Sequence, residues 1–129
     1  MAKIYHPDIL DNGLSELAGR SDLNYVVTAG VPASVAEASG VYPTGKRVSD
    51  VVVMASMSIA DGASGSRQVA TGNQALEVAV DVSDEDLHIC IYDATRVLVV
   101  NDELTDQALT EGNPLSAPSF TIGLGQPAA

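Results

Sequence analysis

Apolar and polar side chains alternate over several short stretches of the chain, at the two-residue period typical of β-strands. The clearest stretch covers residues 76–82, where every second side chain is aliphatic. There the pattern predicts an inward face of Leu76, Val78, Val80 and Val82 and an outward face of Glu77, Ala79 and Asp81. Strands are also predicted over residues 23–29, 51–59, 87–93, 96–100 and 118–124. This part of the chain therefore has the pattern of a β-rich domain.

The same alternation assigns side chains to faces in three of these segments. In residues 51–59 one face is shared by the apolar residues Val51, Val53, Ala55, Met57 and Ile59, and Ser56 and Ser58 lie opposite. In residues 87–93 it separates Leu87, Ile89 and Ile91 from His88, Cys90 and Tyr92. In residues 118–124 the shared face is Phe120, Ile122 and Leu124. Ala94-Thr95 is predicted to form a tight hairpin between two strands.

The first part of the chain has a helical period instead. The apolar residues Ile9, Leu10, Leu14 and Leu17 recur near one side of a 3.6-residue helix, which predicts a helix over residues 7–19. Pro7 suits its first turn and Gly19 can end it. The internal Asn12-Gly13 counts against this helix, because an interior glycine costs about 1 kcal/mol relative to alanine.

Two glycine-rich segments are predicted to be loops. Residues 30–45 contain two prolines and three glycines, and should form a long loop with a short helical turn at 33–38. Residues 60–66 should form a second, Gly/Ser-rich loop.

One helix followed by six or seven short strands predicts a mainly β fold. It would be an antiparallel β-sandwich or a small barrel, with one N-terminal helix. At 129 residues we expect a single domain. Its parts would be an N-terminal arm (1–6), the helix (7–19), a β domain (23–124) and a C-terminal tail (125–129).

The charge balance excludes some classes of partner. The chain has a formal net charge of −11 and only six Lys and Arg residues, which form no basic stripe. We therefore expect neither nucleic-acid binding nor binding to anionic membranes. An acidic surface suits docking on a basic or mixed-charge partner. The lone cysteine excludes an internal disulfide, and without the apolar run of a signal peptide we expect synthesis in the cytosol.

The stretch 83–93, SDEDLHICIYD, is the strongest candidate for chemistry. His88 and Cys90 would share a strand face, but a zinc site needs three or four converging ligands and no suitable ligand spacing is present. The acidic turn at 81–86 lacks the Gly and Glu positions of the twelve-residue calcium loop, although an irregular cation site there remains an alternative. The favoured interpretation is a solvated turn that leads into a buried strand.

No catalytic constellation emerges from the rest of the sequence. Gly-x-Ser-x-Gly and phosphate-binding Gly-Lys-Ser/Thr motifs are absent. Only His6 and His88 could act as a base near neutral pH. We therefore expect no enzyme activity, no cofactor and no metal. A small metal-dependent or hydrolytic enzyme that uses His88 and the acidic turn is the least favoured alternative.

The order of motifs is similar to that of small, mostly uncharacterised virion proteins of tailed bacteriophages. The resemblance spans nearly the whole chain and depends on the segments 22–48, 87–100 and 119–124. The matching positions are Pro32, Glu37, His88, Phe120, Ile122 and Gly123. The chain departs from the group at Val35, where an aromatic is common, and at Ile89, where a tryptophan is common. The resemblance implies a structural role in the virion, without an active site.

These observations together predict a phage capsid decoration (cement) protein. It would be assembled in the host cytoplasm and bind the outer surface of the head, where it would contact the major capsid protein or other virion subunits as a homo-oligomer, with a trimer as one form. An exterior position suits its acidity, since packaged DNA would repel it. The predicted anchors are the aliphatic and aromatic residues Ile4, Tyr5, Val41 and Tyr42. For Tyr5 and Tyr42, packing on the domain's own core is the alternative. A tail or tail-fibre subunit is the alternative function.

Overall fold

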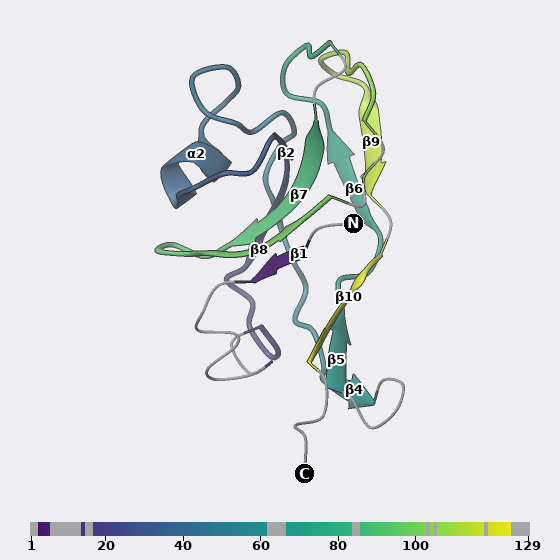
Figure 1. The fold of residues 1–129 in the computed structure, drawn as a ribbon. Helices are drawn as coiled ribbons and strands as arrows, with labels where there is room; N and C mark the ends of the chain where they lie inside the picture. The colour runs from purple at the N-terminus through teal and green to yellow at the C-terminus, as the bar shows by residue number, and fades with distance from the viewer. Residues whose placement is uncertain are drawn as a thin grey trace.

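The computed structural model is mainly β, with antiparallel sheets and very little helix (Figure 1). It describes residues 3–5, 14, 17–61, 67–83, 86–102, 104, 106–117 and 119–124. In this part of the chain the strands form a five-stranded, a three-stranded and a two-stranded sheet. The mainly β antiparallel class predicted from the sequence is confirmed.

The five-stranded sheet has the order β1-β8-β7-β2-β3. Its strands are β1 (Lys3–Tyr5), β2 (Asn24–Ala29), β3 (Val52–Val53), β7 (Leu87–Tyr92) and β8 (Val97–Asn101). The longest pairing joins β2 to β7 over six residues, from Asn24 opposite Tyr92 to Ala29 opposite Leu87. The β-branched residues in these strands fit a pleated surface that is covered on both sides. The sheet is therefore strongest at its centre, where β7 has a neighbour on each edge.

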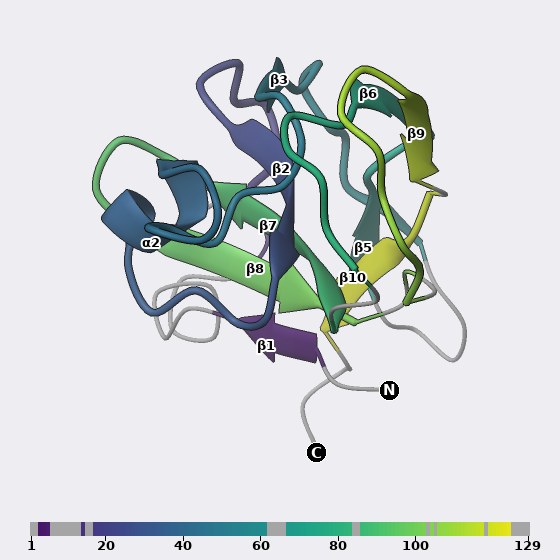
Figure 2. The same cartoon turned by 90° about the horizontal axis from the view of Figure 1, so that it is seen from above.

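The other two sheets lie on the opposite side of the core (Figure 2). Strands β4 (Ala60–Asp61), β5 (Arg67–Ala70) and β10 (Thr121–Leu124) form one, in the order β10-β5-β4. Strands β6 (Gln74–Glu77) and β9 (Pro114–Ala117) form the other. Within the described residues the sheets do not close into a barrel, so the barrel alternative is wrong.

Two apolar clusters pack against the large sheet, one on each of its faces. The main cluster joins Tyr25, Ile89 and Ile91 of the large sheet to Val69 and Ile122 of the three-stranded sheet, all of them fully buried. The second cluster lies on the other face of the large sheet, beneath α2 (Val35–Ser39). Its buried members are Val26, Ala38, Cys90, Tyr92 and Val100. The alternation predicted for residues 87–93 is confirmed, and both faces of β7 are buried.

The short helix α2 is fixed by its own N-terminal capping. Ser34 Oγ accepts a hydrogen bond from the Glu37 N–H, and Glu37 Oε1 accepts one from the Ala33 N–H. These reciprocal bonds satisfy helix-start donors, which explains a helix of only one turn in a loop rich in glycine and proline. The helical turn predicted at 33–38 is confirmed with a small shift.

Several sequence predictions fall outside the described residues or need correction. Most of the predicted helix 7–19 and the whole C-terminal tail (125–129) lie outside them. At the predicted end of that helix the Leu17 and Ala18 N–H groups both donate to the Leu14 carbonyl oxygen, and Gly19 has a positive φ of 73°, as suits the residue predicted to end it. Ala18 also forms a β-bridge with Met57, and the helix itself stays a prediction. Residues 3–5 of the predicted arm (1–6) pair with β8 as an edge strand.

The strand predicted over residues 51–59 needs the largest correction. Only Val52 and Val53 pair with β2, and the chain then leaves this sheet to reach β4. Val51, Val53 and Ile59 of the predicted apolar face are exposed, whereas Met54, which is not on that face, is buried. In residues 76–82 the predicted faces are correct, although regular pairing ends at Glu77. Strands β5 and β9 were not predicted.

Candidate functional site

The strand that carries His88 and Cys90 is enclosed on both faces. Cys90 is fully buried in the second cluster under α2, and burial raises the pKa of its thiol to about 12. His88 lies two residues earlier, opposite Thr28 of β2, with 8% of its side chain exposed. Its Nδ1 lies 3.2 Å from the backbone oxygen of Asp86. A buried, protonated thiol and an enclosed imidazole are poorly placed to bind a metal or attack a substrate.

The acidic residues around this strand stabilise backbone turns. Asp81 Oδ1 accepts a hydrogen bond of 2.8 Å from the Glu111 N–H, and Asp106 Oδ1 accepts one of 2.9 Å from the Leu87 N–H. Asp84 and Glu85 of the predicted acidic turn lie outside the described residues. Among the residues that the structure does describe, no group of three or more His, Cys, Asp and Glu side chains is placed to hold a metal ion.

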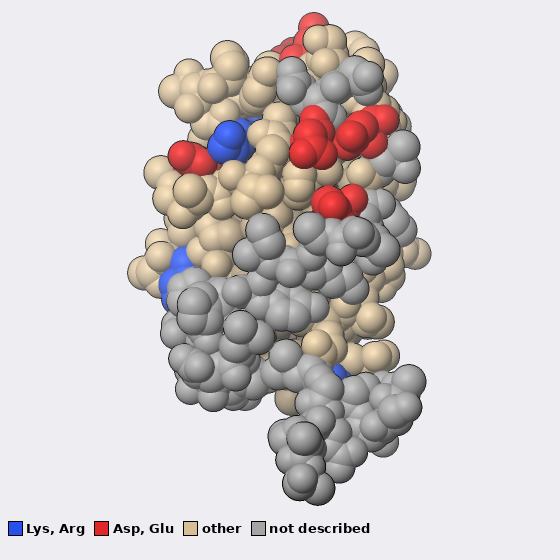
Figure 3. Space-filling view, in the orientation of Figure 1, with Lys and Arg blue, Asp and Glu red and all other residues tan. Residues whose placement is uncertain are grey.

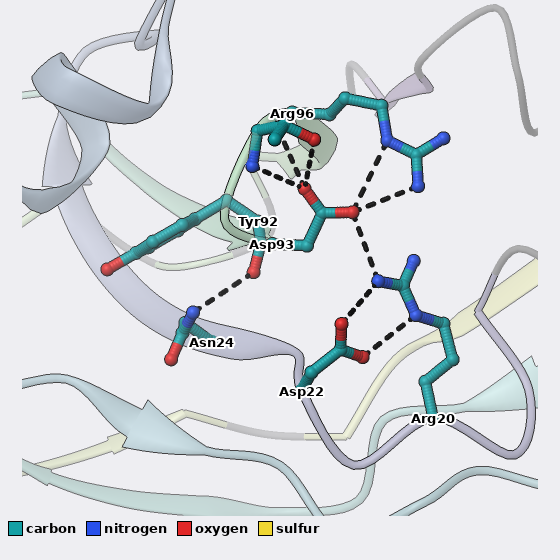
Figure 4. Close-up of polar contacts among 7 residues, drawn as sticks. Arg20, Asp22, Asn24, Tyr92, Asp93 and Arg96 are labelled. Carbon is teal, nitrogen blue, oxygen red and sulfur yellow. Dashed lines mark hydrogen bonds and ion pairs between the residues drawn. The ribbon is translucent and has the colours of Figure 1, made fainter.

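Asp93 is the centre of a charged network at the end of β7 (Figure 4). Its Oδ2 accepts hydrogen bonds from Arg20 at 3.1 Å and from Arg96 at 2.9 Å. Its Oδ1 accepts from the backbone N–H groups of Thr95 and Arg96. Arg20 also holds Asp22 at 2.6 Å. The network joins the loop before β2 to the hairpin between β7 and β8.

The contacts of Asp93 in this network stabilise the hairpin between β7 and β8. Burial would raise the pKa of Asp93, but the hydrogen bonds from Thr95, Arg96 and Arg20 outweigh it and hold that pKa well below its ordinary value. The carboxylate therefore stays ionised, and its acceptor positions are used within the hairpin and by Arg20. The tight hairpin predicted at Ala94-Thr95 is confirmed, but the role of Asp93 in closing it was not predicted. The Asp-x-Thr-Arg spacing, typical of a side chain that caps its own turn, could have indicated it.

The predicted anchor residues are separated into two regions. The backbone of Ile4 and Tyr5 lies in β1, opposite Val100 and Val99 of β8, and their side chains are outside the described part. Val41 is 42% exposed in the loop after α2. Tyr42 is half-buried and packs against the main cluster, so its ring contributes to the domain's own core.

The loop that presents Val41 is braced by backbone hydrogen bonds. The Arg47 N–H donates to Gly40 and the Tyr42 N–H donates to Arg47, so the two arms of the loop are tied together. Arg47 Nε also donates to the Ser39 carbonyl oxygen at 2.8 Å, which ties the loop to the end of α2. A Cβ atom on Gly45 would overlap the backbone of Gly40, so the close approach of the two arms requires glycine there. We call residues 40–47 the braced loop.

A second group of exposed apolar side chains lies on the apolar face predicted for residues 51–59. Val51, Val53 and Ile59 are 40%, 63% and 40% exposed. They belong to residues 51–60, which carry no formal charge and run from β3 to the start of β4. We call residues 51–60 the crossing segment. The lack of any charge over these ten residues could have set the segment apart in the sequence.

Acidic side chains gather on one face of the molecule. In Figure 3 they cover the region where β7 begins beside β6 and β9, while Lys and Arg lie singly. Among the exposed acidic residues, Asp86 directly precedes β7, Asp106 accepts from the Leu87 N–H, and Asp81 accepts from the Glu111 N–H. The braced loop and the crossing segment contrast with this acidic region, because each presents exposed valine.

No protein-family model, curated protein or solved structure matches the chain. In the described residues, no helix has the length and apolarity needed to cross a membrane.

Proposed function

We propose that this chain is a structural protein of a tailed-phage virion, namely a capsid decoration protein. It binds the outer surface of the head and stabilises contacts between capsid subunits, the major capsid protein being its main partner. The finer fold class that we propose is a two-layer β-sandwich, with the five-stranded sheet facing the two smaller ones across the main cluster. Such a body is stiff, since β7 is buried on both faces.

The observation that carries this proposal is the braced loop with its exposed valine. Val41 is 42% exposed although the backbone on both sides of it is hydrogen-bonded. An apolar side chain on a preorganised loop can enter a pocket of a partner with little loss of conformational entropy. Weak contacts of this kind add up through avidity when many copies bind one shell.

The charge of the chain supports an exterior position. With a formal net charge of −11, the protein would be repelled by packaged DNA, whereas acidic side chains that face solvent keep it soluble. In the described region His88 and Cys90 are enclosed, which supports a structural protein over the alternative of an enzyme.

The test is binding to purified phage heads, with Val41→Lys as the variant. We expect wild-type protein to co-sediment with heads at a fixed copy number and Val41→Lys to lose at least tenfold in affinity. Thr110→Lys changes an exposed residue outside the braced loop and is the matched control. Electron microscopy of labelled particles locates the bound protein. Label confined to the tail would exclude decoration in favour of the tail alternative, and absence from particles would exclude both.

A further inference from the structure

We propose that the three-stranded sheet β10-β5-β4 opens as a unit of its own, and that a polar corner of the chain controls this opening. The corner consists of residues 71–73, between β5 and β6, and residues 119–120, just before β10. We call these residues the polar corner. The inference concerns a conformational change that the proposed function does not include, and it does not depend on that function.

One long antiparallel ribbon carries both small sheets (Figure 1). Residues 67–77 run opposite residues 114–124, first as β5 with β10 and then as β6 with β9. Ala70 pairs with Thr121, and the same register resumes three residues later, where Gln74 pairs with Ala117. The ribbon therefore passes from one sheet to the other at the polar corner without a change of register.

Side-chain oxygens replace the backbone ladder inside the polar corner. The Phe120 N–H donates to Thr71 Oγ1 at 3.0 Å, and the Thr71 N–H donates to the Phe120 carbonyl oxygen at 2.9 Å. The Ser119 N–H donates to Asn73 Oδ1 at 2.8 Å. The Gly72 N–H donates to Ser119 Oγ at 3.1 Å. Three of these four bonds thus depend on a side chain that a single substitution can remove.

The three-stranded sheet is attached to the five-stranded sheet by side-chain packing. Within the described residues, none of its strands pairs with a strand of the large sheet. Val69 and Ile122 are fully buried in the main cluster and make this contact. β5 and β10 pair over four residues, whereas β2 and β7 pair over six and β7 has a second neighbour. Elements with fewer ladder bonds open at a lower free energy than the centre of a core sheet.

The polar corner controls the opening because its bonds exist only in the closed sheet. Thr71 and Phe120 are each 5% exposed, so loss of the Thr71 hydroxyl leaves the Phe120 N–H buried without this acceptor. In the open sheet the same N–H bonds to water, so the loss destabilises the closed form alone. Asn73 and Ser119 are exposed, and water can replace their oxygens in part.

The first experiment is native-state hydrogen exchange of the full chain. In wild type we expect the amides of β5 and β10 to exchange through one opening, more often than those of β2 and β7. This opening should depend less steeply on urea, because it exposes less surface. Amides of β5 and β10 that exchange only together with those of β2 and β7 would overturn the separate opening.

Two variants separate this opening from global unfolding. Asp93→Asn breaks the charged network at the end of β7, which stays formed while only the three-stranded sheet opens. It should speed exchange in β2 and β7 and leave β5 and β10 unchanged. Equal acceleration of all four strands would mean that the domain opens only as a whole.

Thr71→Val tests the polar corner itself. It destabilises the closed protein relative to both open forms, so exchange in β5 and β10 should rise about tenfold and exchange in β2 and β7 by the same factor. Ser119→Ala should have a smaller effect of the same kind and serves if Thr71→Val does not fold. Ser116→Ala removes an exposed hydroxyl from β9, outside the corner, and is the matched control. Exchange in β5 and β10 that neither corner variant speeds beyond this control would reject the role of the corner.

The second experiment places a thiol inside the opening unit. Val69→Cys puts it in β5, at a position that is fully buried in the main cluster. We expect a thiol reagent to label this position at the frequency with which the β5 amides open, and Thr71→Val to speed the labelling about tenfold. Mass spectrometry distinguishes this label from one on Cys90. A thiol at position 69 that is protected as strongly as the β7 amides would overturn the proposal.

Discussion

Strand β7 and the crossing segment are both rich in aliphatic residues, but β7 is buried in the structure and most of the crossing segment is exposed. Both are short runs of aliphatic residues interrupted by small or polar ones. All six residues of β7 are buried, whereas the crossing segment has two buried methionines between exposed valine, alanine, serine and isoleucine. The difference lies in their neighbours. β7 pairs with β2 along its whole length and with β8 from Ile89 to Tyr92, while the crossing segment pairs with β2 for two residues and then changes sheet.

This comparison shows what fixes the inner face of a strand. Alternation identifies two faces of a strand, but the neighbouring strands decide which face is covered and over how many residues. A segment that leaves one sheet for another cannot keep one face on the core. It then presents apolar side chains to solvent or to a partner, and a surface of this kind is typical of an interaction site.

The largest effect is expected from truncating the centre of β7. Ile89 is fully buried in the main cluster, so Ile89→Ala removes its contacts and leaves a cavity that should cost about 4 kcal/mol. Val53→Ala, at 63% exposure, should change the free energy of unfolding by less than about 0.5 kcal/mol. Urea unfolding of monomeric protein at low concentration measures both. Equal losses would mean that the crossing segment is as important to the core as β7.

A smaller loss is expected on the inward side of the crossing segment. Met54 is 2% exposed and joins the main cluster, so Met54→Ala should cost about 2–3 kcal/mol. The cost should be lower than for Ile89→Ala because the chain around Met54 is paired on fewer sides and can move into the cavity. Val51→Ala, three residues earlier and 40% exposed, is the control. A Met54→Ala protein as stable as the control would show that this segment contributes nothing to the core.

The next effect concerns the charged end of β7. Asp93→Asn keeps an acceptor for the Thr95 and Arg96 N–H groups but removes the charge between Arg20 and Arg96, and should cost about 2 kcal/mol at pH 7. Urea unfolding curves measure this cost. Ser83→Ala, an exposed polar residue before β7, is the control.

The pH dependence of this difference follows from the lowered pKa of Asp93. A carboxylate with a lower pKa in the folded state stabilises the fold above its unfolded pKa of about 3.9 and loses this effect as pH falls toward the folded pKa. The gap between wild type and Asp93→Asn should therefore shrink below about pH 4. A gap that stays constant down to low pH would mean that the carboxylate charge contributes nothing.

The sequence predicted the parts of the fold in which side-chain pattern and burial coincide. The strands at 23–29, 87–93 and 96–100 were found because β-branched residues fill both faces of a central sheet. β5 and β9 were missed because Arg-Gln-Val-Ala and Pro-Leu-Ser-Ala carry too few large apolar residues to alternate. They are strands only because β10 and β6 pair with them. Such long-range pairing is not encoded in local pattern.

For the candidate site, the sequence identified one of the two apolar surfaces. Val41 was named because it lies in the predicted long loop 30–45, although Tyr42 of the same loop packs against the main cluster. Val53 was placed only on the apolar face of a predicted strand, since alternation alone does not show where a chain leaves its sheet. The contrast between buried β7 and the exposed crossing segment thus became visible only with the strand order.

The smallest expected effect is a gain in stability within the sheet centre. Tyr25 of β2 is fully buried, and its hydroxyl has no hydrogen-bond partner in the described structure. Burial raises the pKa of Tyr25, which agrees with a phenol held away from water. An unsatisfied buried hydroxyl costs about 1–3 kcal/mol, so Tyr25→Phe should stabilise the protein by about 1 kcal/mol after the loss of some packing.

Thermal and urea unfolding measure this gain, and Tyr92→Phe on the opposite face of the same sheet is the control. In an alkaline titration of wild type, the Tyr25 phenol should ionise only on unfolding, and Tyr25→Phe should remove that component. If Tyr25→Phe is instead less stable by 1 kcal/mol or more, as expected for a lost hydrogen bond, the hydroxyl has a partner in solution. The large sheet would then contain a polar contact at its centre, and its rigidity would not come from apolar packing alone.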